Sequence, residues 1–305
     1  MMYLMSDIHG YSDLFFRMLE KLSFGTEDRL FIVGDLVAKG PDSLRLLRFV
    51  MESDNICLLR GNHEQRLLQA MGADLGAGIS DSVLTPWTAG DGAGVLGELR
   101  GLPDGERSEV LDFLLGTRLF FRLDYLGKRY ILVHGAPGSK TEAKTGAGGM
   151  DGEAVGEVFR KTATQNGLAG AGQAVGEVFG RTAGSDRTAV DVEGKEIVGR
   201  KTVVQNGSAG AGQAEKMSKG EARRRQKKAV YAVMEKRFSD PKTKTGLPEG
   251  TIAVVGHTPT FKYGAEYAGR ILVRRDKILL DCGSGQGYGI GCLRLEDGAE
   301  FYVRP

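Results

Sequence analysis

The sequence has little cysteine and almost no net charge for its 305 residues. Its three cysteines, Cys57, Cys282 and Cys292, form no CxxC pair, so neither a disulfide framework nor a structural zinc site is indicated. A formal net charge of +2 gives no electrostatic reason to expect nucleic acid or a membrane surface as a partner. No apolar run approaches the ~20 residues of a membrane span, and Asp7 interrupts the N-terminus before a signal region could form. We therefore expect a reduced, cytoplasmic, globular protein.

Short apolar runs alternate with amphipathic stretches along the first 135 residues. Each run closes on glycine or a polar residue, which is typical of strands buried on both faces. The predicted strands are residues 2–6, 30–34, 56–60, 129–135 and 251–255. Helices are predicted from Ser12, from Pro41, which suits a first helical turn, and from His63. Further short strands follow residue 270, with a hairpin around Asp297 and Gly298. This alternation predicts an α/β architecture with functional loops beyond the strand ends.

Glycine and alanine dominate residues 141–214, where a unit of 20 residues repeats. Each unit has too few large apolar residues to offset the entropy lost on ordering, so we interpret this segment as a poorly ordered low-complexity insertion. A small repeat module is the alternative. The insertion divides one domain into an N-terminal part, residues 1–140, and a C-terminal part, residues 215–305. The basic stretch at 215–238 is expected to form a solvated helix face, with contact to nucleic acid or an acidic substrate as the alternative.

All the histidines of the chain lie at or just past the end of a predicted strand, beside glycine or asparagine. They are His9, His63, His134 and His257. Asp7 and Asp35 occupy the same kind of position. Any one of these residues is most simply explained as a structural loop residue. Scattered structural histidines, however, have no reason to avoid every helix and linker, so the set as a whole indicates a metal site.

A centre of two metal ions explains this set. Two divalent ions held about 3.5–4 Å apart need a bridging carboxylate and further carboxylate, imidazole or amide-oxygen ligands. Asp7 and His9 are two residues apart on one extended segment and can bind one ion together, while Asp35 is placed to bridge. The predicted remaining ligands of the second ion are Asn62, His134 and His257. His63 neighbours a ligand but points elsewhere, and a histidine beside two cations is suited to protonate a leaving alkoxide as a general acid.

Five motifs, in this order, resemble the phosphoprotein phosphatase branch of the calcineurin-like metallophosphoesterases. They are DxHG at 7–10, GDxVxxG at 34–40, GNHE at 61–64, VHG at 133–135 and GHTP at 256–259. Within this branch the chain looks nearest to the small bacterial serine/threonine protein phosphatases, over residues 1–137 and 250–303. The resemblance implies a β-sandwich flanked by helices in four α-β-β-α layers, with the metal centre at the strand ends. It also implies two divalent cofactor ions, manganese first, with iron or zinc as alternatives.

The resemblance implies a role for individual residues as well. It assigns Asp7, His9 and Asp35 to the first metal, and Asp35, Asn62, His134 and His257 to the second. Arg60 corresponds to an arginine that holds phosphate oxygens, a task suited to the guanidinium fork. Lys39 stands where the branch has a second such arginine, and it keeps the charge without the fork. Lys236 or Arg237 is the candidate for a further phosphate-binding cation, and Trp87 is expected to pack in the core.

The expected function is hydrolysis of phosphomonoesters, most of all phosphoserine and phosphothreonine in proteins, by a hydroxide that bridges the two metals. Lys39 and Arg60 would neutralise the developing charge, and His63 would protonate the leaving oxygen. Ala38 departs from the branch by replacing an aspartate that normally supports the catalytic histidine. "GDLVAKG" also resembles the symmetrical diadenosine tetraphosphate hydrolases, although those enzymes have aspartate in place of Glu64. Hydrolysis of that small phosphoester is the enzyme alternative, and a metal-binding adaptor with decayed catalysis is the non-enzyme alternative.

Overall fold

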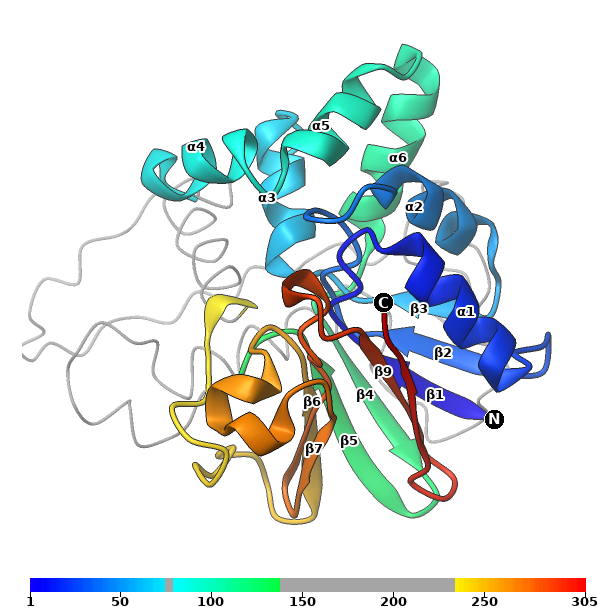
Figure 1. The fold of residues 1–305 in the computed structure, drawn as a ribbon, viewed down its shortest axis with the longest axis vertical. Helices are drawn as coiled ribbons and strands as arrows, with labels where there is room; N and C mark the ends of the chain where they lie inside the picture. Colours follow the sequence, from blue (N-terminus) through cyan, green and yellow to red (C-terminus); the bar gives the residue numbers. More distant parts are fainter. Residues whose placement is uncertain (75–78, 138–233) are drawn as a thin grey trace, which may run out of the picture.

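The computed structural model describes residues 1–74, 79–137 and 234–305, and its strands form two sheets of five (Figure 1). The first sheet has the order β10–β9–β1–β2–β3. Its strands are β1 (Met2–Met5), β2 (Arg29–Ile32), β3 (Ile56–Leu58), β9 (Ile290–Arg294) and β10 (Glu300–Val303). β1, β2 and β3 are parallel, whereas β9 and β10 pair antiparallel, as predicted for a hairpin around Asp297 and Gly298. The strand predictions at 2–6, 30–34 and 56–60 are confirmed.

The second sheet joins strands that precede residue 138 to strands that follow residue 233. Its order is β4–β5–β6–β8–β7, with β4 and β7 as antiparallel edge strands. The strands are β4 (Phe120–Tyr125), β5 (Lys128–Val133), β6 (Thr251–Val255), β7 (Leu272–Arg274) and β8 (Lys277–Leu279). β5 and β6 pair directly and in parallel, with Leu132 opposite Val254. Strands from both described parts of the chain therefore share one sheet.

Alternation along the strands divides their side chains between two apolar cores. Met2 and Leu4 of β1 face the second sheet and share a core with Leu132 of β5. Tyr3 and Met5 point to the other face, where they pack against the helices. The strands are thus buried on both faces, which explains why their sequences read as continuous apolar runs.

Six α-helices are assigned within the described residues, and three of them follow the strands of the first sheet directly. They are α1 (Ser12–Leu22), α2 (Ser43–Glu52), α3 (Asn62–Ala70), α4 (Asp81–Ala89), α5 (Ala93–Arg100) and α6 (Asp104–Gly116). The predicted helix from Ser12 is confirmed, and α2 begins two residues after Pro41. Helices α4, α5 and α6 were not predicted and extend the helical layer beyond α3 (Figure 1).

The outer face of the second sheet is covered differently from the expected fourth layer of helices. Among the described residues, this face packs against Phe238 and Leu247 and against two short 3-10 helices, η3 (Thr260–Tyr263) and η4 (Ala265–Tyr267). A third 3-10 turn, η5 (Ser284–Gln286), precedes β9. The predicted insertion at 141–214, and the basic stretch up to residue 233, lie outside the described residues. No helix in the described part of the chain is long and apolar enough to cross a membrane.

Candidate metal centre

The polar residues singled out in the sequence meet where strands of both sheets end. Asp7 and His9 follow β1, Asp35 follows β2, Asn62 follows β3, His134 follows β5 and His257 follows β6. Parallel strands that share one carboxyl edge bring such residues together, as expected for an open α/β architecture. All six side chains are buried, with exposed fractions between 0% and 7%.

Asp35 lies at the centre of the cluster. Its Oδ2 atom is 3.2 Å from Nε2 of His134 and 3.9 Å from Nε2 of both His9 and His63. Two groups of potential ligand atoms include this carboxylate, one with His9 and His63 and the other with His134 and His257. Within each group the atoms lie within 4.8 Å of one another. A carboxylate common to both groups is placed as a bridging ligand has to be.

Asn62 and Asp7 complete the cluster. Oδ1 of Asn62 is 2.9 Å from Nε2 of His134 and 3.0 Å from Nδ1 of His257. Oδ1 of Asp7 is 3.7 Å from Nε2 of His9. The Asp7 carboxylate also accepts the backbone N–H of His257, at 3.0 and 3.2 Å, which ties the first sheet to the second. The structure therefore brings all six predicted ligands into one buried site.

Backbone carbonyls orient two of the imidazole rings. Nδ1 of His134 donates to the carbonyl oxygen of Val33 at 2.8 Å, and Nδ1 of His9 lies 3.4 Å from the carbonyl oxygen of Val37. Because a carbonyl only accepts, Nδ1 of each ring carries a hydrogen and Nε2 is the nitrogen that faces the cluster. Nε2 is thus the atom with which either ring would bind a metal.

The loops of the cluster adopt backbone conformations that are costly for ordinary residues. Positive φ angles occur at Asp7 (53°), His9 (54°), Asp35 (55°), Ala38 (75°), Lys39 (64°) and His257 (69°). Each costs on the order of 1 kcal/mol, and such strain concentrates at functional sites. Two glycines are required by space alone. A Cβ atom at Gly61 would lie 2.2 Å from Oδ1 of Asp35, and one at Gly256 would lie 2.2 Å from Oδ2 of Asp7.

Glu64 fixes the loop that carries Asp35. Its carboxylate, on the first turn of α3, accepts four backbone N–H groups: those of Asp35 at 2.9 Å, Leu36 at 2.8 Å, Val37 at 3.2 Å and Gly61 at 2.8 Å. Glu64 is fully buried, with an exposed fraction of 0%. The last residue of the GNHE motif therefore serves the backbone, and its carboxylate is occupied on all sides.

The charges of the cluster suit a divalent cation. Burial, and then the charge of Asp281, raise the pKa of Asp7 well above its usual range. Burial raises the pKa of Asp281, which follows β8, to about 6. Burial alone would lower the pKa of His134, but the negative charge of Asp35 outweighs it and raises that pKa to about 10. Buried carboxylates whose charged form is disfavoured are those that a bound cation would neutralise, so this donor set fits a metal centre. Asp281 was not predicted from the sequence.

Lys39 extends into the cluster. Its Nζ atom is 2.8 Å from Nε2 of His9, and its stem lies along Gly285, where a Cβ atom would be 2.7 Å from Cδ of the lysine. The ammonium group thus donates to the nitrogen of His9 that is predicted to bind a metal. Binding of a metal by this nitrogen requires Lys39 to turn away.

The structure gives Arg60 a different environment from the phosphate site expected for it. Its guanidinium group donates to the backbone carbonyls of Leu114 at 2.9 Å and Leu115 at 2.6 Å, to Oγ1 of Thr117 at 3.2 Å and to Oε1 of Gln65 at 3.0 Å. It is 8% exposed. Carbonyls at the end of α6 are left without intrahelical partners, and Arg60 satisfies them. Most of its donors are used in this way, so the role of Arg60 in phosphate binding stays a prediction.

His63 contacts a residue that sequence spacing could not reveal. Its Nε2 atom faces Asp35, while its Nδ1 atom accepts the indole N–H of Trp87 at 2.9 Å. Trp87 is 4% exposed and packs in the core, as expected. It also holds the proposed general acid, although 24 residues separate the two along the chain. A lone tryptophan on an unpredicted helix gave no signal of this contact.

The end of the basic stretch lies beside the cluster. Nε of Arg237 donates to Nε2 of His257 at 3.1 Å, and Arg66 of α3 pairs with Glu235 at 2.5 Å. The backbone carbonyl of Lys236 accepts the N–H of Ala136 at 2.8 Å. Arg237, one of the two cations proposed for phosphate binding in this stretch, thus contacts a predicted ligand with its side chain.

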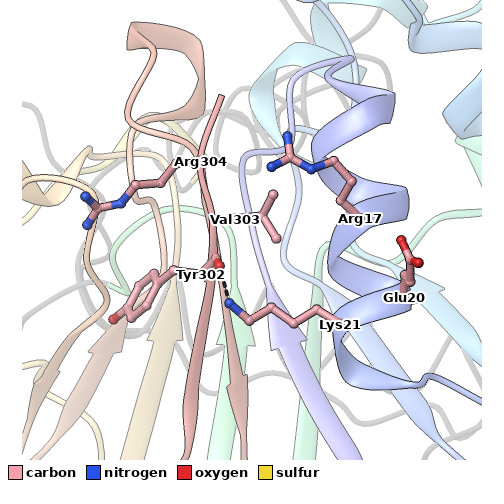
Figure 2. A pocket seen from close by; sticks show the side chains of 6 residues that line it. All are labelled: Arg17, Glu20, Lys21, Tyr302, Val303 and Arg304. Atoms are coloured by element: carbon pink, nitrogen blue, oxygen red, sulfur yellow. Dashed lines mark hydrogen bonds between the residues drawn. The ribbon is translucent and has the colours of Figure 1, made fainter.

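A separate groove of about 620 Å³ lies between α1 and β10 (Figure 2). Its lining includes the cationic residues Arg17, Lys21 and Arg304, and Lys21 donates to the backbone carbonyl of Tyr302 at 2.9 Å. None of the cluster residues lines it. The groove is therefore distinct from the candidate metal centre.

Residues 2–149 match the family model of the calcineurin-like phosphoesterases. This N-terminal part of the chain is similar to the calcineurin-like phosphoesterases. The match contains five of the six predicted metal ligands, whereas His257 lies beyond it. The order of motifs and the convergence of their residues agree with this similarity.

Curated relatives of this chain are named symmetrical bis(5'-nucleosyl)-tetraphosphatases. The protein from Nitrosomonas europaea is 32% identical over 134 residues, which are 43% of this chain and 43% of that protein. The protein from Nitrosospira multiformis is 33% identical over 134 residues, or 43% of this chain and 42% of that protein. The chain thus spans less than half the length of these relatives. Among solved structures, a protein serine/threonine phosphatase from Saccharomyces cerevisiae aligns with 100% of this chain and 79% of its own, at 10% identity and a TM-score of 0.46, a likeness too low to argue from.

Proposed function

We propose that this chain is a metal-dependent phosphoesterase that hydrolyses dinucleoside polyphosphates between their phosphates. The model substrate is diadenosine tetraphosphate, cleaved symmetrically into two nucleoside diphosphates. The observation that supports metal-dependent chemistry most strongly is the position of Asp35, whose Oδ2 lies 3.2–3.9 Å from three histidines. The names of the curated relatives support the substrate class. Manganese is the first metal to test, with iron and zinc next.

Each residue of the cluster has a proposed task. Asp7, His9 and Asp35 would hold one ion, and Asp35, Asn62, His134 and His257 the other. When bound, two divalent cations would polarise the phosphoryl oxygens and activate water. Once it has left His9, Lys39 would offset charge on the substrate phosphates. His63 presents Nε2 beside Asp35, from where it can donate a hydrogen bond to the leaving oxygen.

The sequence favoured phosphoserine and phosphothreonine as substrates, partly because this chain has Glu64 where the tetraphosphate hydrolases have aspartate. In the structure the Glu64 carboxylate accepts four backbone N–H groups and has an exposed fraction of 0%. A buried side chain whose oxygens are occupied in this way does not contact the substrate. The difference between glutamate and aspartate at this position therefore does not argue against a dinucleotide substrate. Protein dephosphorylation remains the second candidate, supported by the resemblance of residues 1–137 and 250–303 to the small bacterial serine/threonine protein phosphatases.

A comparison of two substrates tests the proposal. The manganese-loaded chain is given diadenosine tetraphosphate or a phosphothreonine peptide, with Asp35→Asn as the inactive variant. Asp13→Asn is the matched control, because Asp13 is an exposed acid that pairs with Arg17 on the surface of α1 at 3.2 Å. We expect faster cleavage of the dinucleotide into two nucleoside diphosphates, full activity in the control variant and almost none in Asp35→Asn.

The other outcomes each favour a different function. Faster release of phosphate from the peptide would favour protein dephosphorylation as the function of this chain. Binding of two metal ions without turnover of either substrate would favour the metal-binding adaptor.

A further inference from the structure

The contact between Trp87 and His63 determines which nitrogen of the imidazole carries hydrogen. An indole N–H can only donate, so the Nδ1 atom that it approaches at 2.9 Å must accept. The hydrogen of a neutral His63 is therefore on Nε2. This is the atom that faces Asp35 Oδ2, at 3.9 Å, and hence the metal cluster. His63 differs in this respect from His9 and His134, whose Nδ1 atoms lie against carbonyl oxygens.

The surroundings leave Trp87 little freedom to break this contact. The indole is 4% exposed and belongs to the apolar core of the helical layer. Gly92 closes over its ring, since a Cβ atom there would be 2.6 Å from three ring carbons. The backbone N–H of Gly92 also donates to the Trp87 carbonyl at 2.8 Å. The turn between α4 and α5 thus holds the tryptophan in place.

Within the described residues, the other neighbours of the His63 ring do not contact Nδ1. The His9 ring lies edge-on at a centroid distance of 4.9 Å, and the Asp35 carboxylate is on the Nε2 side. The contact that sets the hydrogen position of His63 is thus the one from Trp87.

We propose that Trp87 is a positioning residue that holds His63 in the neutral tautomer with hydrogen on Nε2, and that this restricts the enzyme to leaving groups that need no proton. The proposal rests on the proposed phosphoesterase function. Nε2–H donates a hydrogen bond to the leaving oxygen and keeps its hydrogen. In the reaction, a water oxygen forms the new bond to phosphorus and its proton passes to solvent. The P–O bond of the anhydride breaks, and its electron pair leaves on the phosphate of a nucleoside diphosphate.

The nature of the leaving group then decides the substrate class. A terminal phosphate leaves as a stable anion, because its second pKa is about 6. The alkoxide of serine or threonine is far more basic and requires a proton as the bond breaks. A histidine that donates only a hydrogen bond therefore favours phosphoanhydrides and aryl phosphates over alkyl phosphates.

Two measurements on the full chain test this inference. In the first, histidine labelled with 15N reports the tautomer through its two-bond 1H–15N correlations, with the His63 signals assigned by His63→Gln. We expect a single tautomer with hydrogen on Nε2 in the wild-type chain and in Thr85→Ala, an exposed control on the same helix. Trp87→Phe keeps an aromatic ring but lacks the N–H, and it should give a mixture. Hydrogen on Nδ1 in the wild-type chain would overturn the inference, whether or not the chain is active.

The second measurement compares kcat/KM for diadenosine tetraphosphate and a phosphothreonine peptide. We expect a ratio of at least a hundredfold in the wild-type chain. Trp87→Phe should lower kcat on the dinucleotide about tenfold, with KM changed less than twofold. Equal rates on the two substrates with hydrogen on Nε2 would overturn the link between tautomer and substrate class. If the chain cleaves neither substrate, the proposed function fails while the tautomer result stands by itself. If Trp87→Phe does not fold, the wild-type spectrum and substrate ratio still decide.

Discussion

Replacing Glu64 by glutamine should weaken the fold and the metal centre together. Glutamine has the same shape, but it presents an NH2 group where the glutamate presents an oxygen. Each carboxylate oxygen of Glu64 accepts two backbone N–H groups: Oε1 those of Leu36 and Val37, and Oε2 those of Asp35 and Gly61. Whichever oxygen is replaced, two buried amides lose their acceptor.

The expected loss of stability follows from two opposing contributions. A buried donor left without an acceptor costs about 1–3 kcal/mol, hence about 2–6 kcal/mol for two. Against this, burial is the main reason that the pKa of Glu64 rises from 4.5 to about 6, and removing the buried charge therefore recovers part of the cost. At about 1.4 kcal/mol per pKa unit, this recovery is about 2 kcal/mol. We expect a net destabilisation of about 0–4 kcal/mol, with a central value of about 2 kcal/mol.

Urea unfolding of the metal-free chain at pH 7.5 measures this difference. The matched control is Glu106→Gln, because Glu106 pairs with Arg48 at 2.7 Å on the surface and both side chains are 51% exposed. An exposed pair of this kind contributes about 0–1 kcal/mol. Because Glu64 fixes the loop of Asp35, its variant should also bind manganese at least tenfold more weakly. Equal unfolding midpoints for the two variants would refute the reasoning.

Three further predictions follow from contacts in and around the cluster. Lys39→Met should bind manganese several-fold more tightly in calorimetry, because the ammonium group no longer competes for Nε2 of His9; unchanged affinity would contradict this. Arg60→Ala should lower the free energy of unfolding by about 1.5–3 kcal/mol, since it removes hydrogen bonds from a charged donor, while KM stays within about twofold; a large rise in KM at unchanged stability would support its phosphate role. The pKa of His134 is about 10 in the folded chain, where the charge of Asp35 outweighs burial, against about 6.5 when unfolded. The stability it contributes is complete below about pH 6.5 and is lost as the pH rises toward 10, so the urea midpoint of the metal-free chain should fall between pH 7 and 9.5, and a flat profile would speak against it.

Much of the fold could be predicted because its central strands are buried on both faces. The runs at β1, β2, β5 and β6 are continuous in apolar residues, so that their ends, and the polar residues just beyond them, stand out in the sequence. β4 was missed because Phe120–Tyr125 alternates apolar and polar residues at the sheet edge. Helices α4 to α6 were missed because glycine and proline, such as Pro86 within α4, mask their pattern.

The cluster was more predictable than the contacts that tune it. Strand ends gather at one edge by topology alone, so the spacing of His9, Asp35 and the other candidates carried the prediction. Side-chain direction is not contained in spacing. Arg60 directly precedes GNHE, yet its guanidinium turns to the carbonyls of α6. The Trp87–His63 contact depends on how an unpredicted helix packs, and the position of Lys39 depends on a positive φ of 64°.

The place of β1 in its sheet has a consequence for synthesis on the ribosome. One edge of β1 pairs with β2, made shortly afterwards, but the other pairs with β9 at Ile290–Arg294. Until that late strand emerges from the exit tunnel, the nascent chain presents an unpaired, apolar strand edge at the centre of the future sheet. Such an edge is a template for intermolecular pairing. The demand on chaperones during translation should therefore last until β9 has been made.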